Sequence, residues 1–346
     1  MTYGEKTHFD VISIDVTGKC NFSCKHCFNY SGSRDDKLIE LKDEEIMTLS
    51  EDIIEQKPSV VCVCGGEPLL RKDLSLNLIR TLKNGGIENV NMVSNGYLLN
   101  ENYAKEIKNS GVDVVQISVD GSKPNSHDWI RNKEGSFEKA ITAIKNLRKE
   151  GVKVGVACTP TKRNLDEVEE LIDMLNEYGV MSFRMQPIMN LGRAKSIEEF
   201  FPSKIDYIKL SRQLNSYSND KRYKINIEWG DPMEHIYAWS HGYKVRSLSI
   251  SAYGDLMISP YIPISFGNIL NHPLPQYIEA GISTAYSLDG VKELIDLMSN
   301  KNELDINSFL DVVPKLYDAD FIPMDILADD IKNKCLKLKK QVEGVI

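Results

Sequence analysis

Three cysteines near the amino terminus, Cys20, Cys24 and Cys27, have the spacing CxxxCxxC. Three thiolates leave one position of a four-coordinate metal, or one iron of a 4Fe–4S cluster, without a protein ligand. Catalytic metal sites keep such an open position, whereas structural sites close it. The spacing therefore indicates a 4Fe–4S cluster with one iron left open.

Two alternative functions of these cysteines remain. A structural zinc ion could take the three thiolates and His26, but His26 lies between two of the thiolates and structural sites usually combine two separate loops. A disulfide with one thiol left over is the other alternative. The chain has seven cysteines, an odd number, and no export signal, which favours metal binding in a reducing compartment.

Composition narrows the possible functions. The 346 residues are enough for one large domain, or for a large domain with a smaller appendage. The net charge of −8 does not indicate a nucleic-acid surface. The sequence has no signal peptide and no run of 18 apolar residues, so we expect a cytoplasmic protein without a membrane span.

Short β-rich runs alternate with longer amphipathic runs. Strands are expected at 11–16, 60–64, 89–93, 114–119, 152–159 and 180–185. Helices are expected at 43–56, 73–83, 101–109, 136–149 and 166–178. Six such βα units predict a parallel sheet in an α/β fold, a partial (β/α)6 barrel over residues 1–220.

The pattern changes after about residue 200. Helices are expected at 203–216, 291–298, 306–313 and 324–342, and strands at 224–228, 246–250 and 256–259. The last two strands flank the turn sequence 252–255, which predicts a hairpin. Residues 221–346 are thus predicted to form a small α+β extension.

The cysteine spacing directly after the first strand, in a partial barrel, resembles the radical S-adenosylmethionine enzymes. The resemblance implies that the open iron binds the amino and carboxylate groups of S-adenosylmethionine. It also implies that one electron from the cluster cleaves this cofactor to a 5′-deoxyadenosyl radical, which abstracts a hydrogen atom from the substrate.

Gly65, Gly66, Glu67 and Pro68 follow the second strand. Glycines let the backbone approach a ligand closely, and a carboxylate can accept hydrogen bonds from an ammonium group. An ordinary strand-to-helix turn is the alternative. By resemblance this is the GGEP motif, whose backbone and acid hold the methionyl amino group.

Further polar residues follow the third and fourth strands, where ligand-facing groups of βα barrels lie. By resemblance, Asn95, Ser118 and Asp120 are assigned to the cofactor site, with Ser118 and Asp120 near its ribose or carboxylate. Arg131 is in the place of an arginine that suits the methionyl carboxylate. A turn or a surface helix is the alternative for these residues.

The resemblance also places His26 and Phe28 beside the adenine, where flat rings could stack. The segment Gly192-Arg193-Ala194 is similar to one that faces the substrate cavity in relatives. The remaining cysteines of this part of the chain, Cys62, Cys64 and Cys158, are interpreted as buried thiols that pack as small apolar groups.

The extension resembles the SPASM or Twitch extensions of peptide maturases. The turn before Leu256 and the run Gly267-Asn268-Ile269 fit its frame, but 258–261 carries no cysteine where relatives have one. Only Cys335 lies beyond residue 158, and one thiolate cannot hold an auxiliary cluster. We expect a Twitch-like scaffold without a cluster, one 4Fe–4S cluster in the chain, and a packing function for Cys335 rather than hydrogen-atom donation.

Three hypotheses for the function remain. The first is a radical enzyme that modifies a ribosomally made peptide or a peptide-derived natural product. The second is the same chemistry on a small molecule such as a tetrapyrrole or a cofactor precursor, and the third is a non-catalytic metal-binding protein. The resemblance implies an electron donor such as flavodoxin or ferredoxin. Because the motif begins at Cys20, a leader-peptide-binding domain would be a separate protein.

Overall fold

The computed structural model describes residues 9–32, 38–230, 244–259, 262, 264–293 and 322–343. The chain divides into two compact units that interleave along the sequence. The terminal unit contains Met1–Asp15, Lys37–Val61 and Met233–Ile346, and the barrel unit contains Val16–Asp36 and Cys62–Pro232. The cysteine loop and the other residues predicted for the cofactor site all belong to the barrel unit.

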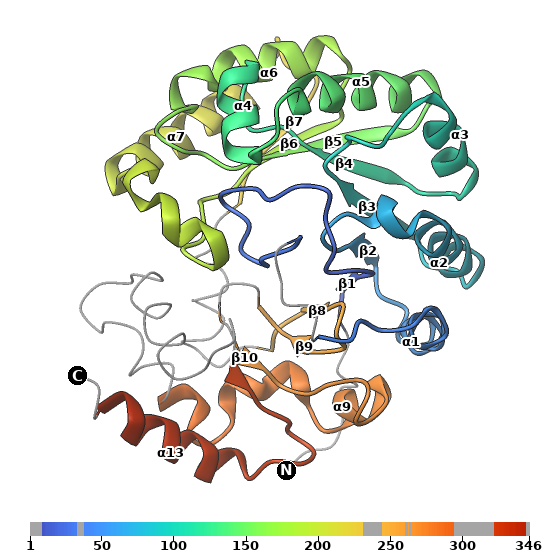
Figure 1. The fold of residues 1–346 in the computed structure, drawn as a ribbon, viewed down its shortest axis with the longest axis vertical. Coiled ribbons are helices and arrows are strands. Elements are labelled where there is room, and N and C mark those ends of the chain that lie inside the picture. The colour runs from blue at the N-terminus through green and yellow to red at the C-terminus, as the bar shows by residue number, and fades with distance from the viewer. Residues whose placement is uncertain are drawn as a thin grey trace. The chain divides into compact units, whose positions relative to one another are not determined.

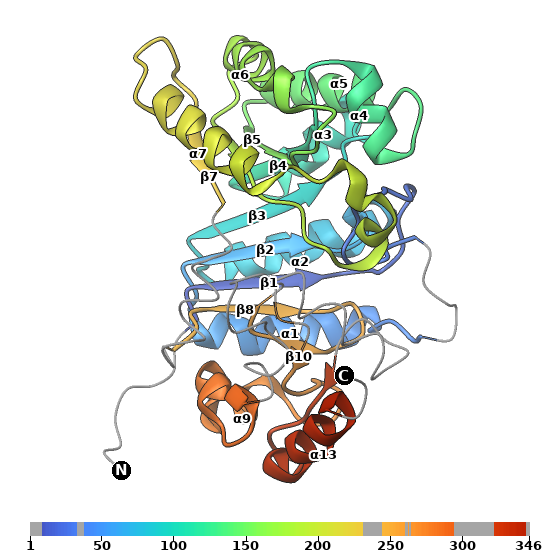
Figure 2. The same ribbon diagram turned by 90° about the vertical axis from the view of Figure 1, so that its left-hand side faces the viewer.

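The strands of the barrel unit follow the order β7-β6-β5-β4-β3-β2, and β3 to β7 pair in parallel (Figure 2). Their bounds are β2 (Val60–Cys64), β3 (Asn89–Ser94), β4 (Val114–Ser118), β5 (Lys153–Cys158), β6 (Ser182–Met185) and β7 (Asn226–Trp229). The first two residues of β2 belong to the terminal unit. The edge strand β7 leaves the sheet open, as expected for a partial barrel. It was predicted as part of the extension, but it pairs with β6; the domain boundary at residue 220 stays a prediction.

Helical segments connect these strands, and the longer ones cover one face of the curved sheet (Figure 1). They are η1 (Pro68–Arg71), α2 (Lys72–Asn84), α3 (Glu101–Asn109), α4 (Pro124–Arg131), α5 (Ser136–Lys149), η2 (Leu165–Glu167), α6 (Val168–Glu177), η3 (Gly192–Phe200) and α7 (Lys204–Ser218). Gly111 and Gly179 follow α3 and α6 with φ of +85° and +68°, so the predicted helix ends are confirmed.

Helix α4 was not predicted. Its eight residues are too few to show an amphipathic period, and they begin with proline, which sequence reasoning treats as a helix breaker. Here Pro124 occupies the first turn, where a missing N–H costs nothing. The helix ends at Asn132, which adopts the left-handed conformation with φ of +52°.

Buried and half-buried side chains alternate along the strands, so the two faces of this sheet differ in burial. On β3, Val90 and Met92 are fully buried, and so are Val115 and Ile117 on β4. Their neighbours in the sequence are only half-buried, which leaves the opposite face of the sheet partly open.

The terminal unit contains two small sets of strands. Strand β1 (Val11–Asp15) pairs in parallel with β8 (Ser247–Ile250), and β8 pairs antiparallel with β9 (Leu256–Met257). The predicted hairpin is therefore confirmed. Its other elements are α1 (Asp43–Gln56), β10 (Ile264–Ser265), α9 (Leu274–Glu279), η4 (Ile282–Ser287), β11 (Ile322–Pro323) and α13 (Ile331–Glu343).

One helix prediction in this unit is wrong at its start. The helix predicted at 324–342 begins only at Ile331, because the side chain of Asp325 accepts a hydrogen bond from the backbone N–H of Leu327 at 3.0 Å and holds a turn. The helix predicted at 306–313 and residues 294–298 of the helix predicted at 291–298 lie outside the described residues.

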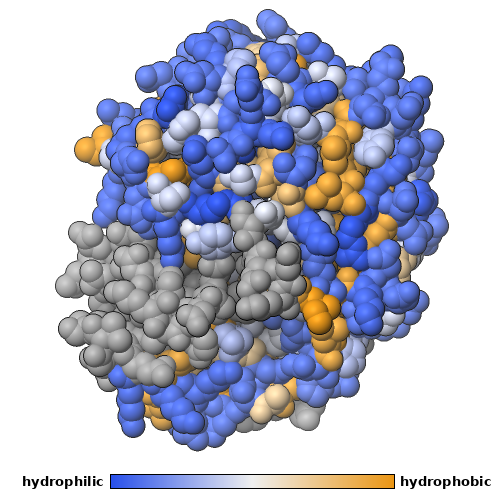
Figure 3. Space-filling model, in the orientation of Figure 1, coloured by the Kyte–Doolittle hydropathy of each residue, from blue (hydrophilic) through white to orange (hydrophobic). Residues whose placement is uncertain are grey.

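Hydrophilic side chains dominate the described surface in the view of Figure 3, and the hydrophobic ones form small groups. Within the described ranges, no helix is long and apolar enough to cross a membrane.

Candidate active site

The cysteine loop, residues 16–32, has three free thiols. Cys24 is buried, whereas Cys20 and Cys27 are half-buried. Burial raises the pKa of Cys20 to about 12 and also raises that of Cys24, where the charge of Arg131 opposes the shift. Both thiols are thus neutral before a metal binds, and metal binding must displace their protons.

The loop fits an iron–sulfur cluster better than a single zinc ion. Among the described residues, no three His, Cys, Asp or Glu side chains converge on one metal position. In a 4Fe–4S cluster each thiolate binds a different iron, so the sulfurs need not converge on one point. Two buried polar atoms of the loop, Asn21 Nδ2 and His26 Nδ1, also have no hydrogen-bond partner within the described ranges. Such atoms are expected beside a bound group.

Two glycines after β2 make room for the start of the cysteine loop. A side chain at Gly66 would place its Cβ 2.1 Å from the carbonyl oxygen of Lys19, and one at Gly65 would meet the carbonyl oxygen of Thr17 at 2.5 Å. The backbone N–H of Gly66 donates to Thr17 at 2.7 Å, and that of Glu67 donates to Lys19 at 2.9 Å. These two N–H groups therefore hold the loop itself.

The carboxylate of Glu67 is fully buried behind that turn. It accepts hydrogen bonds from the Ser94 hydroxyl and the Asn95 backbone N–H, both at 2.8 Å, and from the Leu69 backbone N–H at 3.2 Å. Burial raises its pKa. Glu67 thus ties the ends of β2 and β3 together, and Pro68 begins η1 beside it.

Asn95 connects the end of β3 to the cysteine loop. Its side-chain amide donates to Asn21 Oδ1 at 2.8 Å, and its Nδ2 lies 3.9 Å from the Cys20 sulfur. This places a predicted cofactor-site residue directly beside a predicted cluster ligand.

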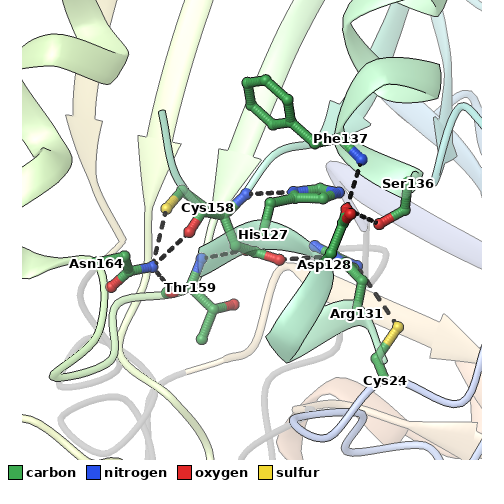
Figure 4. A network of polar contacts seen from close by, with 10 residues as sticks. Cys24, His127, Asp128, Arg131, Ser136, Phe137, Cys158, Thr159 and Asn164 are labelled. Atoms are coloured by element: carbon green, nitrogen blue, oxygen red, sulfur yellow. Dashed lines mark hydrogen bonds and ion pairs between the residues drawn. The ribbon is translucent and has the colours of Figure 1, made fainter. Parts of the chain in front are cut away.

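Arg131, at the end of α4, is a buried arginine rather than a surface one. Its side chain is 11% exposed, its Nε lies 2.5 Å from Asp120 Oδ2, and its Nη1 lies 4.0 Å from the Cys24 sulfur (Figure 4). Burial by itself would lower the pKa of Arg131, but the negative charge and hydrogen bond of Asp120 oppose this effect and the pKa lies above its ordinary value. The sequence alone left a surface helix as the alternative for this residue, and the structure contradicts that alternative.

Asp120 is fully buried and its oxygens are already engaged. Besides Arg131, its carboxylate accepts from the backbone N–H of Thr159 at 2.9 Å. Burial by itself would raise the pKa of Asp120, but the charge of Arg131 together with smaller contributions, among them the hydrogen bond from Thr159, outweighs burial, and the pKa lies below its ordinary value. Asp120 thus orients Arg131, while Ser118, two residues earlier, is half-buried on the open face of the sheet.

A second set of contacts fixes the backbone of Asp120. Its N–H donates to His127 Nδ1 at 3.0 Å, and its carbonyl oxygen accepts from Asn164 Nδ2 at 2.7 Å (Figure 4). Burial lowers the pKa of His127 to about 4, so this ring is neutral and able to accept. The thiol of Cys158 is buried 4.0 Å from the same Asn164 amide, as its interpretation as a packing residue requires.

Arg193, to which the sequence assigned no individual function, clamps the cysteine loop. Its Nε donates to the carbonyl oxygen of Cys24 at 2.8 Å, its Nη2 to that of Ser31 at 2.9 Å, and its backbone N–H to that of Cys27 at 3.0 Å. At Gly192, a Cβ would lie 2.3 Å from the carbonyl oxygen of Cys27. In the sequence, the pair Gly192-Arg193 after the sixth strand was the available sign of this contact with the cysteine loop. The resemblance to relatives instead predicted that the pair faces the substrate cavity.

The remaining candidates differ in their exposure. The ring of Phe28 is 42% exposed. The ring of His26 is more buried, and this burial lowers its pKa to about 4. Cys62 and Cys64 are half-buried rather than buried, with their sulfurs 3.3 Å apart on the open face of β2. Their interpretation as buried packing groups is therefore wrong, because the described helices cover the other face of the sheet.

Comparisons with known proteins also indicate a radical S-adenosylmethionine enzyme. Residues 14–175 match the model of the Radical SAM superfamily. The chain is 25% identical over 292 residues to an AdoMet-dependent heme synthase of Methanosarcina barkeri, with 78% of this chain and 82% of the relative covered. It is 28% identical over 229 residues to the sporulation killing factor maturation protein SkfB of Bacillus subtilis, with 66% of this chain and only 52% of the relative covered.

A solved structure shares the fold. SuiB of Streptococcus suis bound to S-adenosylmethionine superposes with a TM-score of 0.68 at 13% identity, over 93% of this chain and 78% of that one. Taken with the matched family model and the cysteine loop held by the GGEP turn, these similarities show that the chain is a member of the radical SAM superfamily.

Proposed function

We propose that this radical SAM enzyme uses a single 4Fe–4S cluster to modify a ribosomally made peptide or a peptide-derived natural product. The observation that carries the cluster assignment is the loop of three free thiols, which the GGEP turn holds at Thr17 and Lys19 and which Arg193 holds at Cys24 and Cys27. Similarity to SkfB, named as a maturation protein, supports a peptide substrate.

In this proposal Cys20, Cys24 and Cys27 bind the cluster. When bound, the cluster and S-adenosylmethionine supply a 5′-deoxyadenosyl radical that abstracts a hydrogen atom from the substrate. The protein's task is to hold both groups in place and to exclude water. Arg131 is pre-oriented by Asp120 and carries a fixed positive charge 4.0 Å from the Cys24 sulfur, which suits a cofactor carboxylate.

We assign the remaining cofactor-binding residues from where each lies relative to the cysteine loop and the open face of the sheet. Ser118 lies at the carboxyl end of β4 on the open face, and Asn95 lies beside Cys20. His26 carries a buried nitrogen, Nδ1, that has no partner among the described residues, and Phe28 offers an exposed ring. Both rings belong to the cysteine loop, which supports their assignment to the adenine.

The proposal of one cluster rests on the extension. Its one cysteine, Cys335, is 2% exposed, and a Cβ at Gly290 would lie 2.8 Å from its Cβ. Burial raises the pKa of this thiol to about 11. A buried, protonated thiol against the turn at Gly290 suits a packing function.

A second candidate function is the same chemistry on a tetrapyrrole or another small molecule. It is favoured by the similarity to the heme synthase, which extends over more of this chain than the similarity to SkfB does. Both candidates need a one-electron donor such as flavodoxin or ferredoxin. A peptide substrate would also call for a leader-binding protein or domain.

Anaerobic reconstitution tests the cluster assignment. We expect about four irons per chain and formation of 5′-deoxyadenosine on reduction with S-adenosylmethionine. Cys24→Ala should abolish the product, while the matched control Cys335→Ala should keep the iron content of the wild type. About eight irons per chain, or loss of half the iron in Cys335→Ala, would contradict the proposal of one cluster.

A further inference from the structure

The open face of the barrel sheet carries a row of side chains that runs across four strands. Ser118 on β4 is the register partner of Ala157 on β5, Ala157 is that of Arg184 on β6, and Arg184 is that of Glu228 on β7. The alternate residues Phe183 and Met185 are fully buried on the opposite face. Arg184 therefore projects from the same face as Ser118, about 10 Å away at the spacing of neighbouring strands.

Arg184 is exposed, and among the described residues it has no ion pair. Its register partner Glu228 does not neutralise it. The Glu228 carboxylate instead accepts a hydrogen bond at 2.5 Å from the side-chain amide of Asn226, two residues earlier on the same strand. The Glu228 carboxylate is thus engaged by its own strand.

The side chain of Arg184 lies beside Gly230. Its Nε lies 3.0 Å from the position that a Cβ at Gly230 would take, and Gly230 directly follows β7. Because Gly230 has no side chain, the guanidinium of Arg184 has room to pass beside it. The arginine therefore extends toward the carboxyl-terminal edge of the sheet, where active sites of βα barrels lie.

We propose that Arg184 is the substrate-anchoring residue of this enzyme and binds a carboxylate of the substrate through its guanidinium. A guanidinium at that edge, without an ion pair to any residue that the structure describes, suits a bidentate carboxylate contact. Ala157, the small residue between Arg184 and the cofactor-site residue Ser118, leaves room for the substrate. The inference rests on the proposed function, because it takes the open face as the substrate side.

Binding of defined probes to the reconstituted full-length protein, without reductant, tests this inference. One probe is a porphyrin with four propionates, compared with its tetramethyl ester by the shift of its absorption band. The other is a set of short peptides in which one glutamate is replaced by glutamine, followed by calorimetry. The variants are Arg184→Gln and Arg184→Lys, with Glu228→Gln and the exposed arginine variant Arg80→Gln as controls.

We expect at least one carboxylate probe to bind the wild type about tenfold more tightly than Arg184→Gln. Arg184→Lys should be intermediate, the two controls should not weaken binding, and the ester or glutamine probes should not distinguish the variants. A response limited to the porphyrin or to the peptides identifies the source of the carboxylate.

Two results overturn the inference: equal binding by the wild type and Arg184→Gln, or no binding of either carboxylate probe to the wild type. Failure of the proposed function is a separate result. It would appear as wild-type protein that makes no 5′-deoxyadenosine on reduction, in an assay that does not involve Arg184 variants.

Discussion

The guanidinium of Arg193 donates from Nε to the carbonyl oxygen of Cys24 at 2.8 Å, across 169 positions of the sequence. The same side chain also bonds the carbonyl oxygen of Ser31. A residue after the last predicted barrel strand therefore fixes the backbone of the loop that carries the three thiols. The loop is held by its carbonyl groups, which leaves the sulfurs available to a metal.

Arg193→Gln should weaken cluster retention. The amide cannot bridge both carbonyl groups, so the loop gains freedom and the three thiols lose their common orientation. We expect iron per chain after anaerobic gel filtration to fall by at least half. Arg80→Gln, on the exposed side of α2, should retain the iron of the wild type. Equal iron in both variants would show that the clamp is dispensable.

Gly192→Ala should damage the loop through a steric clash. The new Cβ would lie 2.3 Å from the carbonyl oxygen of Cys27, in a backbone conformation with φ of +57°. Gly135→Ala is the matched control, because Gly135 has φ of +73° and nothing within 4 Å of the added Cβ. Both variants carry the strain of positive φ, about 1 kcal/mol.

Only the clash distinguishes these two variants. We therefore expect loss of cluster iron in Gly192→Ala and near-normal iron in Gly135→Ala. Similar iron losses in the two variants would assign the effect to backbone strain instead.

Asp120→Asn should destabilise the barrel unit strongly. The substitution leaves Arg131 buried beside an amide that presents donors to it, and removing one partner of a buried ion pair costs about 3–5 kcal/mol. Urea unfolding of the metal-free protein measures the change. Glu101→Gln breaks the exposed pair with Lys149 and should leave the free energy of unfolding nearly unchanged.

Stability should fall in mild acid because His127 must stay neutral. Burial lowers its pKa to about 4 from an ordinary value of 6.5, so the unfolded chain takes up a proton that the folded chain refuses. Between pH 7 and pH 5 this residue alone should cost about 2 kcal/mol of unfolding free energy.

His127→Asn isolates that contribution, because Oδ1 of asparagine can accept the hydrogen bond from the Asp120 backbone N–H. The variant should lose about 2 kcal/mol less than the wild type between pH 7 and pH 5 in urea unfolding. The same pH slope in both proteins would assign the acid sensitivity to other groups, such as His26.

Periodicity and spacing were sufficient for the regular elements. Helices 43–56, 101–109 and 136–149 were predicted with the bounds that the structure has, because each combines an amphipathic period with a clear end. Helix α4 was missed because eight residues do not show a period. The start of α13 was misplaced because a side chain of Asp325 forms a turn where the pattern alone favours a helix.

The sequence by itself determined the chemistry: three thiols with the spacing of a three-coordinated cluster, followed by a Gly-Gly-Glu-Pro turn in a βα order. The residues of each motif are close together in the sequence, so their spacing can be read without the tertiary structure. Only the tertiary structure decided which groups support that loop, because Gly66, Arg131 and Arg193 are brought to it by strands far apart in sequence. It also decided that Glu67 and Asp120 are buried, since burial depends on the packing of neighbouring strands and helices rather than on residue type.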